Sequence, residues 1–346
     1  MRTTIRDWLP ASPLVSSIKT VHETRSRPFL NRKDYRQVFP PPNRQTSGFR
    51  SFAMDAKPVP KLMYGTAWKK DATADLVLLA LKTGFRGIDT AAQPRHYKEP
   101  LVGAAVKQAI SSGIVKRSDI FIQTKFTPVD GQNLGDLPYD PDAPLEEQVH
   151  TSIASSLQNF RHSDSEPAYL DSVVLHSALR TVQDTVKVWK ALETYVPHQI
   201  RQLGISNTPF LVIDHLCTSP AITVRPAYVQ NRFYPATRWE GRLRAYCREM
   251  GMVFQAFWTL TGNPDLLRST PVQKLATSAN IEQPAALYAL VLGLEGTVVL
   301  DGTTNETHMK DDLNGIEIVN DYAQGEQGQT IWSECLGEFK KLIGEK

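Results

Sequence analysis

The chain has 346 residues, with 39 Lys and Arg against 36 Asp and Glu, which gives a formal net charge of +3 at pH 7. The first 56 residues hold ten basic and four acidic side chains, so the remaining 290 carry 29 basic and 32 acidic ones. A mildly acidic body argues against nucleic-acid binding, which normally needs Lys and Arg clustered on one face.

Three cysteines, Cys217, Cys247 and Cys335, are too widely spaced for a disulfide framework or a zinc site. They fit a reduced intracellular compartment, the cytoplasm, and we expect no metal. The longest apolar stretch, residues 285–294, is about half of a membrane span, so neither a transmembrane helix nor a membrane partner is expected. No stretch near the start has the apolar centre of a secretory signal.

Residues 1–56 form a basic extension with six prolines and no sustained periodicity, which predicts a disordered segment ahead of one domain at 57–346. Because the extension is rich in Arg and poor in acids, residues 1–53 could instead be a mitochondrial transit peptide. A translation start at Met54 is a third interpretation.

From Lys61 onward, short β-type runs alternate with amphipathic helical stretches. The expected strands are 62–66, 85–89, 120–125, 170–176, 200–206, 227–231, 252–258 and 297–300. The expected helices are 72–83, 99–111, 145–160, 185–195, 209–217, 238–250, 265–279, 283–292 and 306–314. Eight such units in about 260 residues predict an α/β protein with a closed (β/α)8 TIM barrel. No Gly-x-Gly-x-x-Gly follows the first strand, so a dinucleotide fingerprint is absent.

In a β/α barrel the functional site lies at the carboxyl ends of the strands. Polar residues stand at these ends on five successive strands, and a tyrosine follows the second strand closely. They are Asp89, Tyr97, Lys125, His176, Ser206, Asn207 and Gln230. Each one alone could be a loop cap, a rim charge or a structural histidine, but their joint occurrence on successive strand ends indicates a catalytic site.

This set resembles the aldo-keto reductase superfamily over about 250 residues, from Lys61 to Leu313. Asp89, Tyr97, Lys125 and His176 match that family's Asp-Tyr-Lys-His tetrad. Segment 204–207, Gly-Ile-Ser-Asn, is similar to its Gly-Val-Ser-Asn, and segment 256–260 stands at the place of its Ala-Tyr-Ser-Pro-Leu. The sequence of segment 229–234, Val-Gln-Asn-Arg-Phe-Tyr, is similar to that of fungal members. The resemblance implies reduction of an aldehyde or ketone with NADPH or NADH.

Carbonyl reduction needs a hydride at carbon and a proton at oxygen. The resemblance implies that Tyr97 is the general acid, that Asp89 holds Lys125, and that His176 orients the carbonyl oxygen. A free tyrosine has a pKa of about 10. We expect the Lys125 cation to lower the pKa of Tyr97, because it would stabilise the phenolate.

For the cofactor, the resemblance implies that Ser206, Asn207 and Gln230 bind the nicotinamide carboxamide and that Phe257 stacks on its ring. The other expected cofactor contacts follow the last two strands: Thr259, Leu260, Thr261, Gly262, Gly302, Thr303, Thr304, Asn305, His308, Asp311 and Asp312. Gly302 and His308 replace the Lys and Arg that clamp the 2′-phosphate in many members. We expect NADPH, with NADH as the alternative.

Asp89 and Tyr97 are eight residues apart, where the family more often has about five, so segment 93–96 is expected to loop out. Trp68, Tyr139 and Phe233 are the expected apolar walls of the substrate pocket, and loop 126–144 is expected to overhang it. We expect a small-molecule carbonyl substrate and a monomer or weak homo-oligomer.

Three other functions stay open. The same tetrad could oxidise an alcohol or sugar, or the barrel could bind the cofactor in a regulatory or interaction role. A glycoside hydrolase is disfavoured because it needs paired carboxyls, and Asp89 is the single acidic strand end.

Overall fold

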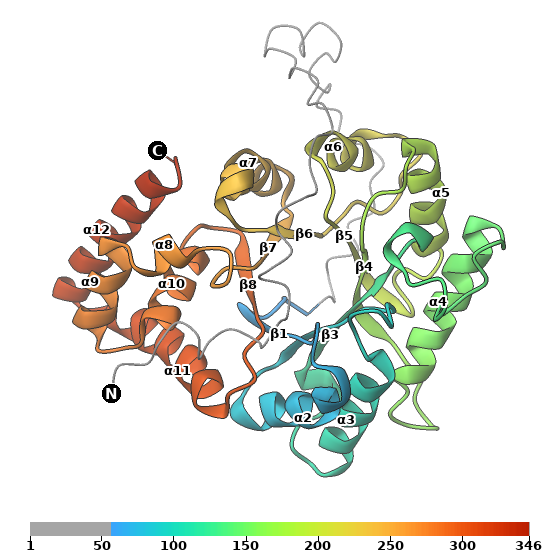
Figure 1. Cartoon of the computed structure of the whole chain (residues 1–346), viewed down its shortest axis with the longest axis horizontal. Helices are drawn as coiled ribbons and strands as arrows, with labels where there is room; N and C mark the ends of the chain where they lie inside the picture. The colour runs from blue at the N-terminus through green and yellow to red at the C-terminus, as the bar shows by residue number, and fades with distance from the viewer. Residues whose placement is uncertain (1–56, 346) are drawn as a thin grey trace, which may run out of the picture.

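The computed structural model describes residues 57–345. The expected disordered extension, the transit-peptide alternative and Met54 lie outside the described residues. Eight parallel strands pair in chain order and close into a barrel, which confirms the (β/α)8 TIM barrel. Figure 1 shows the helices arranged around the central strands. Within residues 57–345, no helix combines the length and the apolar character needed to cross a membrane.

The strands are short and almost entirely buried, as expected for a parallel barrel covered by helices. They are β1 (Leu62–Gly65), β2 (Gly87–Asp89), β3 (Phe121–Phe126), β4 (Leu170–Leu175), β5 (Ile200–Ser206), β6 (Tyr228–Arg232), β7 (Val253–Phe257) and β8 (Thr297–Asp301). The pairing register sets Asp89 beside Gln123 and Ser206 beside Gln230. The polar strand ends therefore meet at one rim of the barrel.

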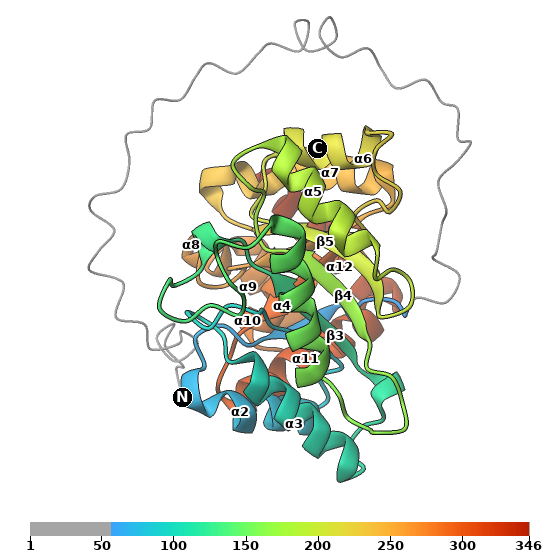
Figure 2. The same ribbon diagram turned by 90° about the vertical axis from the view of Figure 1, so that its right-hand side faces the viewer.

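The helices form the outer layer. They are α2 (Thr73–Thr83), α3 (Glu99–Ser111), α4 (Leu145–Asn159), α5 (Val182–Glu193), α6 (Phe210–Thr218), α7 (Gly241–Met250), α8 (Pro264–Leu267), α9 (Thr270–Ala279), α10 (Gln283–Leu292), α11 (Glu306–Tyr322) and α12 (Glu326–Leu342). Figure 2, the view at 90°, shows α3, α4 and α5 following one another along one side, in agreement with their contacts.

The structure differs from the expected helices in three places. The stretch 265–279 is divided into α8 and α9, because Ser269 is extended and Pro271 begins a new helix. The expected helix 238–250 begins only at Gly241, since the three preceding residues have left-handed φ angles between 49° and 54°. The last expected helix continues to Tyr322, and α12 was not predicted at all; it packs against α9 and buries Phe339.

The barrel interior is layered. Met63, Phe121 and Tyr228 form an apolar cluster at one level. Next comes a polar layer: the Gln123 amide donates to Asp89 Oδ1 at 2.7 Å and to Gln255 Oε1 at 2.7 Å, and the Gln230 amide donates to the same two oxygens at 3.0 and 2.9 Å. A buried network with its partners supplied is rigid. It therefore fixes the base of the site at the carboxyl ends of the strands.

Candidate active site

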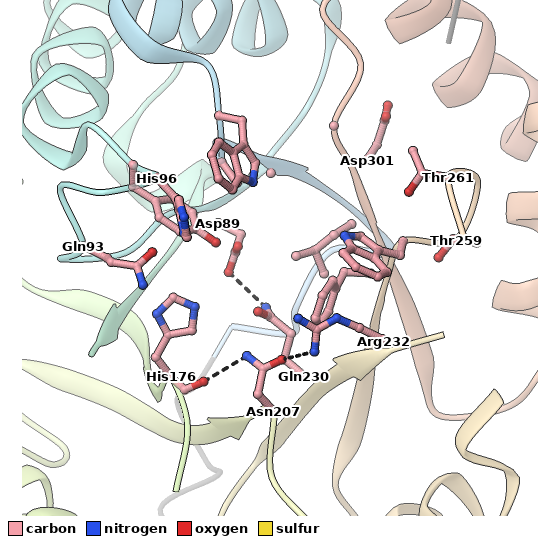
Figure 3. Close-up of a pocket in the computed structure, with 18 of the residues that line it drawn as sticks. Asp89, Gln93, His96, His176, Asn207, Gln230, Arg232, Thr259, Thr261 and Asp301 are labelled. Atoms are coloured by element: carbon pink, nitrogen blue, oxygen red, sulfur yellow. Dashed lines mark hydrogen bonds between the residues drawn. The ribbon is translucent and has the colours of Figure 1, made fainter. Parts of the chain in front are cut away.

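A cavity of about 530 Å³ opens at the carboxyl ends of the strands (Figure 3). This size is in the range of small-molecule and cofactor pockets. Twelve of the expected site residues line it: Trp68, Asp89, Tyr97, His176, Asn207, Gln230, Phe257, Thr259, Leu260, Thr261, Gly302 and Thr303. The structure thus brings together strand ends that are far apart in the sequence.

Asp89 and Lys125 form a buried ion pair beside the cavity. Lys125 Nζ lies 2.6 Å from Asp89 Oδ2 and donates to the Thr90 carbonyl at 2.8 Å. The two side chains are 1% and 3% exposed. Burial lowers the pKa of Lys125, and the charge of Asp89 opposes that effect. The same ammonium lies 5.1 Å from the centroid of the Tyr97 ring, so it stands directly beside the proposed acid.

The longer spacing between Asp89 and Tyr97 is absorbed by a turn. The Gln93 carbonyl accepts from the backbone N–H groups of His96 at 3.1 Å and Tyr97 at 3.0 Å. The Gln93 amide donates to the Gly131 carbonyl at 2.6 Å, which ties the turn to the loop after β3. The extra residues therefore fold out, as expected, and Tyr97 returns to the cavity.

The expected direction of the Tyr97 pKa shift is wrong. Burial raises the pKa of Tyr97, and the negative charge of Asp89 adds to the rise. The neutral phenol is favoured because a phenolate at this position would lose its hydration. Tyr97 consequently keeps its proton at neutral pH and has one to donate. Among the described residues its hydroxyl has no hydrogen-bond partner.

His176 is neutral in the site. Burial holds its pKa well below the usual value, and the charge of Lys125 lowers it further. Its Nδ1 lies 2.7 Å from Thr127 Oγ1, and its ring is edge-on to Tyr97 with centroids 5.9 Å apart. The imidazole is therefore fixed next to the phenol and can act as a neutral hydrogen-bonding group.

Polar groups at the carboxyl ends of β5 and β6 hydrogen-bond to one another. Asn207 Nδ2 donates to the His176 carbonyl at 3.0 Å and to Ser206 Oγ at 3.1 Å, and Ser206 Oγ donates to the Gln230 carbonyl at 2.7 Å. Asn207 has a φ of 48°, a left-handed conformation that Asn tolerates better than most residues. Figure 3 shows the bonds from Asn207 to His176 and from Gln230 to Asp89.

Two expected pocket walls lie elsewhere. Tyr139 is 5% exposed, stacks on Phe126, and donates its hydroxyl to the Thr127 carbonyl at 2.6 Å. Phe233 is fully buried in the core between barrel and helices, because it follows Arg232 and points to the opposite side of the strand end. Loop 126–144 contributes Thr127 and Gly131 to the cavity.

Several expected cofactor residues also do not line the cavity: Ser206, Gly262, Thr304, Asn305, His308, Asp311 and Asp312. Asn305 caps α11, its Oδ1 accepting from the backbone N–H groups of Thr307 and His308. The His308 and Asp312 side chains are buried under α11, where burial and the neighbouring Asp301 raise the pKa of Asp312 well above its usual value. They do not present a phosphate clamp at the surface of the cavity.

Two cations in the cavity, Lys69 and Arg232, were not among the expected site residues. Lys69, after Trp68, donates its ammonium to the Gly302 carbonyl, and burial lowers its pKa to about 8. A Cβ added at Gly302 would lie 4.0 Å from this ammonium. Arg232 stands two residues after Gln230 on β6. Side chains alternate between the two faces of a strand, so the pattern could have placed Arg232 on the same inward face as Gln230. No local pattern pointed to Lys69.

The closed barrel, with a buried Asp–Lys pair beside a tyrosine and a histidine, defines a β/α-barrel protein with a polar cavity at the carboxyl ends of its strands. The profile of the Aldo/keto reductase family matches residues 61–320. The chain belongs to this family, whose members reduce carbonyl groups with NADPH or NADH.

Relatives agree with this membership. The chain is 26% identical over 330 residues to aldo-keto reductase family 4 member C11 of Arabidopsis thaliana, covering 85% of this chain and 96% of that protein. It is 28% identical over 227 residues to the NAD(P)H-dependent D-xylose reductase of Scheffersomyces stipitis, covering 58% and 64%. The crystal structure of MGS-M4, an aldo-keto reductase from a Medee basin deep-sea metagenome library, has a TM-score of 0.62 at 21% identity and covers 81% and 92%. That likeness supports the fold.

Proposed function

We propose that this chain reduces an aldehyde or ketone to the alcohol with a nicotinamide cofactor, and that Tyr97 is the general acid. The observation that carries the proposal is the buried Asp89–Lys125 pair, whose ammonium lies 5.1 Å from the Tyr97 ring at the wall of the cavity. A barrel with a purely regulatory role would not need this costly buried pair next to a phenol that has no hydrogen-bond partner among residues 57–345.

In the proposed reaction Tyr97 donates its hydroxyl proton to the carbonyl oxygen. A nicotinamide cofactor, when bound, would supply the hydride. Lys125 stabilises the phenolate left behind, and Asp89 keeps the ammonium in place. His176, neutral and fixed by Thr127, hydrogen-bonds the carbonyl oxygen. Run in reverse, the same residues would accept a proton from an alcohol, so the oxidative direction uses the same site.

The residues present fit a nicotinamide cofactor. Thr259 Oγ1 and Gln93 Oε1 belong to cavity-lining residues, are buried, and have no hydrogen-bond partner among the described residues. Such orphaned polar atoms point to a ligand that supplies the missing bonds. Asn207 and Gln230 would hold the carboxamide, and Phe257 provides an aromatic face for the ring.

For the cofactor we propose NADPH over NADH. The Lys69 ammonium lies at the Gly302 carbonyl, near the space that a longer side chain at 302 would enter, and so provides a cation for the 2′-phosphate. Asp301, which also lines the cavity, opposes an added negative charge. Dissociation constants for the two cofactors test this choice, and tighter binding of NADH would reverse it.

Tyr97→Phe tests the mechanism. Positioned acid catalysis contributes roughly 10²–10⁴ in rate, so we expect kcat to fall by about that factor while the NADPH dissociation constant changes little. Tyr139→Phe is the matched control, because that phenol is outside the cavity. Turnover of Tyr97→Phe near the native rate, against a panel of aldehydes, ketones and sugars, would disprove the role.

We propose the cytoplasm as the compartment and a monomer or weak homo-oligomer as the assembly. N-terminal sequencing of the native protein tests the alternative of a cleaved transit peptide, which an intact Met1 would exclude. Sedimentation of the purified full chain tests the assembly.

A further inference from the structure

Arg232 directs a guanidinium into the cavity from the end of β6 (Figure 3). Its Nη1 donates to Asn207 Oδ1 at 2.9 Å. Its Cζ lies 5.3 Å from the centroid of the Phe257 ring and 4.7 Å from that of the Trp258 ring. A guanidinium has five N–H donors. One of them has an acceptor among the described residues, so most of its hydrogen-bonding capacity is unused.

The charge of Arg232 also has no counter-charge in the part of the chain that the structure describes. Asp89 is paired with Lys125, and the charge of Asp301 acts on Lys69. Arg232 forms no ion pair within residues 57–345. Its positive charge contributes to the low pKa of His176, so its field reaches the place where the carbonyl would bind.

Trp258 holds the guanidinium at this place. Its backbone has a φ of 62°, which is rare and costly for a bulky residue. The indole is 49% exposed at the cavity and packs edge-on to Tyr234 and Phe257 as well as over Arg232. Backbone strain of this kind persists where a fixed geometry is required. Here it keeps a cation at the cavity mouth rather than in open solvent.

We propose that Arg232 receives an anionic group, so that the preferred carbonyl substrates of this site carry a carboxylate or a phosphate. A planar guanidinium binds either group through two parallel hydrogen bonds. The inference rests on the proposed function and names the substrate class of the same site.

The proposal also accounts for a conflict within the cavity. The Asn207 oxygen and the Phe257 ring that hold Arg232 are the groups proposed to receive the nicotinamide. When the cofactor is bound, Asn207 and Phe257 contact the nicotinamide, so the guanidinium, still held at Trp258, needs a new acceptor. An acidic group on the substrate supplies it. The other anion that Arg232 could bind in such a complex is a phosphate of the cofactor. The experiment below distinguishes the substrate's acidic group from the cofactor's phosphate.

The test compares two aldehydes of nearly equal shape, 4-formylbenzoate and 4-formylbenzamide, with NADPH as reductant. A hydrogen bond to a charged group contributes about 1.5–3 kcal/mol, so we expect the native protein to favour the anion in kcat/KM by roughly 10- to 100-fold. Arg232→Gln should reduce this ratio to about 1, and Arg232→Lys should retain part of it. Arg238→Gln, at an exposed arginine with the same charge change, should leave the ratio as it is. Because the readout is a ratio, a general loss of activity cancels.

Binding supplies a second readout. Calorimetric titration with benzoate and benzamide should show binding of benzoate that Arg232→Gln loses. If Arg232→Gln weakens NADPH binding tenfold but keeps the substrate ratio, the anion is the cofactor's phosphate and the proposal is overturned. A native ratio near 1 or equal binding of benzoate and benzamide also overturns it. If no aldehyde is reduced while benzoate still binds through Arg232, the proposed reductase function fails and the anion site stands.

Discussion

Asp89→Asn should destabilise this protein strongly, because it leaves a buried ammonium without its counter-charge. In the native structure Lys125 Nζ lies 2.6 Å from Asp89 Oδ2, and both side chains are at most 3% exposed. The asparagine oxygen could still accept from Gln123 and Gln230, which bond Asp89 Oδ1 at 2.7 and 3.0 Å. Its amide nitrogen, itself a donor, would then face Nζ.

Removing one partner of a buried ion pair costs about 3–5 kcal/mol. Against a total stability of about 5–15 kcal/mol, that is about a fifth or more of the free energy of unfolding. The loss should also depend on pH. Without Asp89 the pKa of Lys125 falls further below its unfolded value, so between these two pKa values the unfolded chain binds more protons than the folded one. Stability of the variant should therefore rise with pH across that window, more steeply than in the native protein.

Urea unfolding followed by circular dichroism at pH 7 and pH 9 measures both effects. The decisive comparison is the double variant Asp89→Asn with Lys125→Met, which removes the isolated charge and should recover part of the loss. A cost below about 1 kcal/mol for the single variant, or a double variant less stable than the single, would refute the reasoning.

Three further predictions concern stability and cofactor choice. Thr181→Ala removes the Oγ1 that accepts from the Asp184 backbone N–H at 3.0 Å at the start of α5, and thermal unfolding should show a loss of about 1 kcal/mol. Gly103→Ala would place a Cβ 2.0 Å from the Asn159 carbonyl oxygen, so urea unfolding should show a loss of about 1–3 kcal/mol. Because the pKa of Lys69 is about 8, the affinity for NADPH relative to NADH should fall as pH rises through that value; fluorescence titrations giving a constant ratio would contradict this.

Much of the fold followed from hydrophobic periodicity. Helices α3 and α10 and strand β5 have the residue bounds that the pattern predicted. The spacing of apolar residues indicates which face of a helix or strand is buried, and that spacing is contained in the segment itself. The turn at 93–96 was likewise predictable, because the chain between two placed residues was too long for a direct connection.

Features that depend on contacts between distant segments were not predictable. Helix α12 is a different case: Ile331, Cys335 and Phe339 recur every four residues, a local helical signal that the prediction did not use, and the helix packs on α9. No local sequence rule predicts left-handed φ angles for the three residues before α7 or for Trp258. Tyr139 and Phe233 were expected in the pocket, but their aromatic rings found more complete burial in the core.

By itself, the sequence determined the barrel, the rim at which the site lies, and the residue types that reach it. Strand order and alternation are local properties, and a parallel barrel brings all carboxyl ends to one side. Only the tertiary structure decided the electrostatics. Burial and the charge of Asp89 raised the pKa of Tyr97, while Lys69, in the turn after β1, and Arg232, at the end of β6, entered the cavity. Desolvation and charge pairing depend on what surrounds a group in space, and that surrounding exists only after the chain has folded.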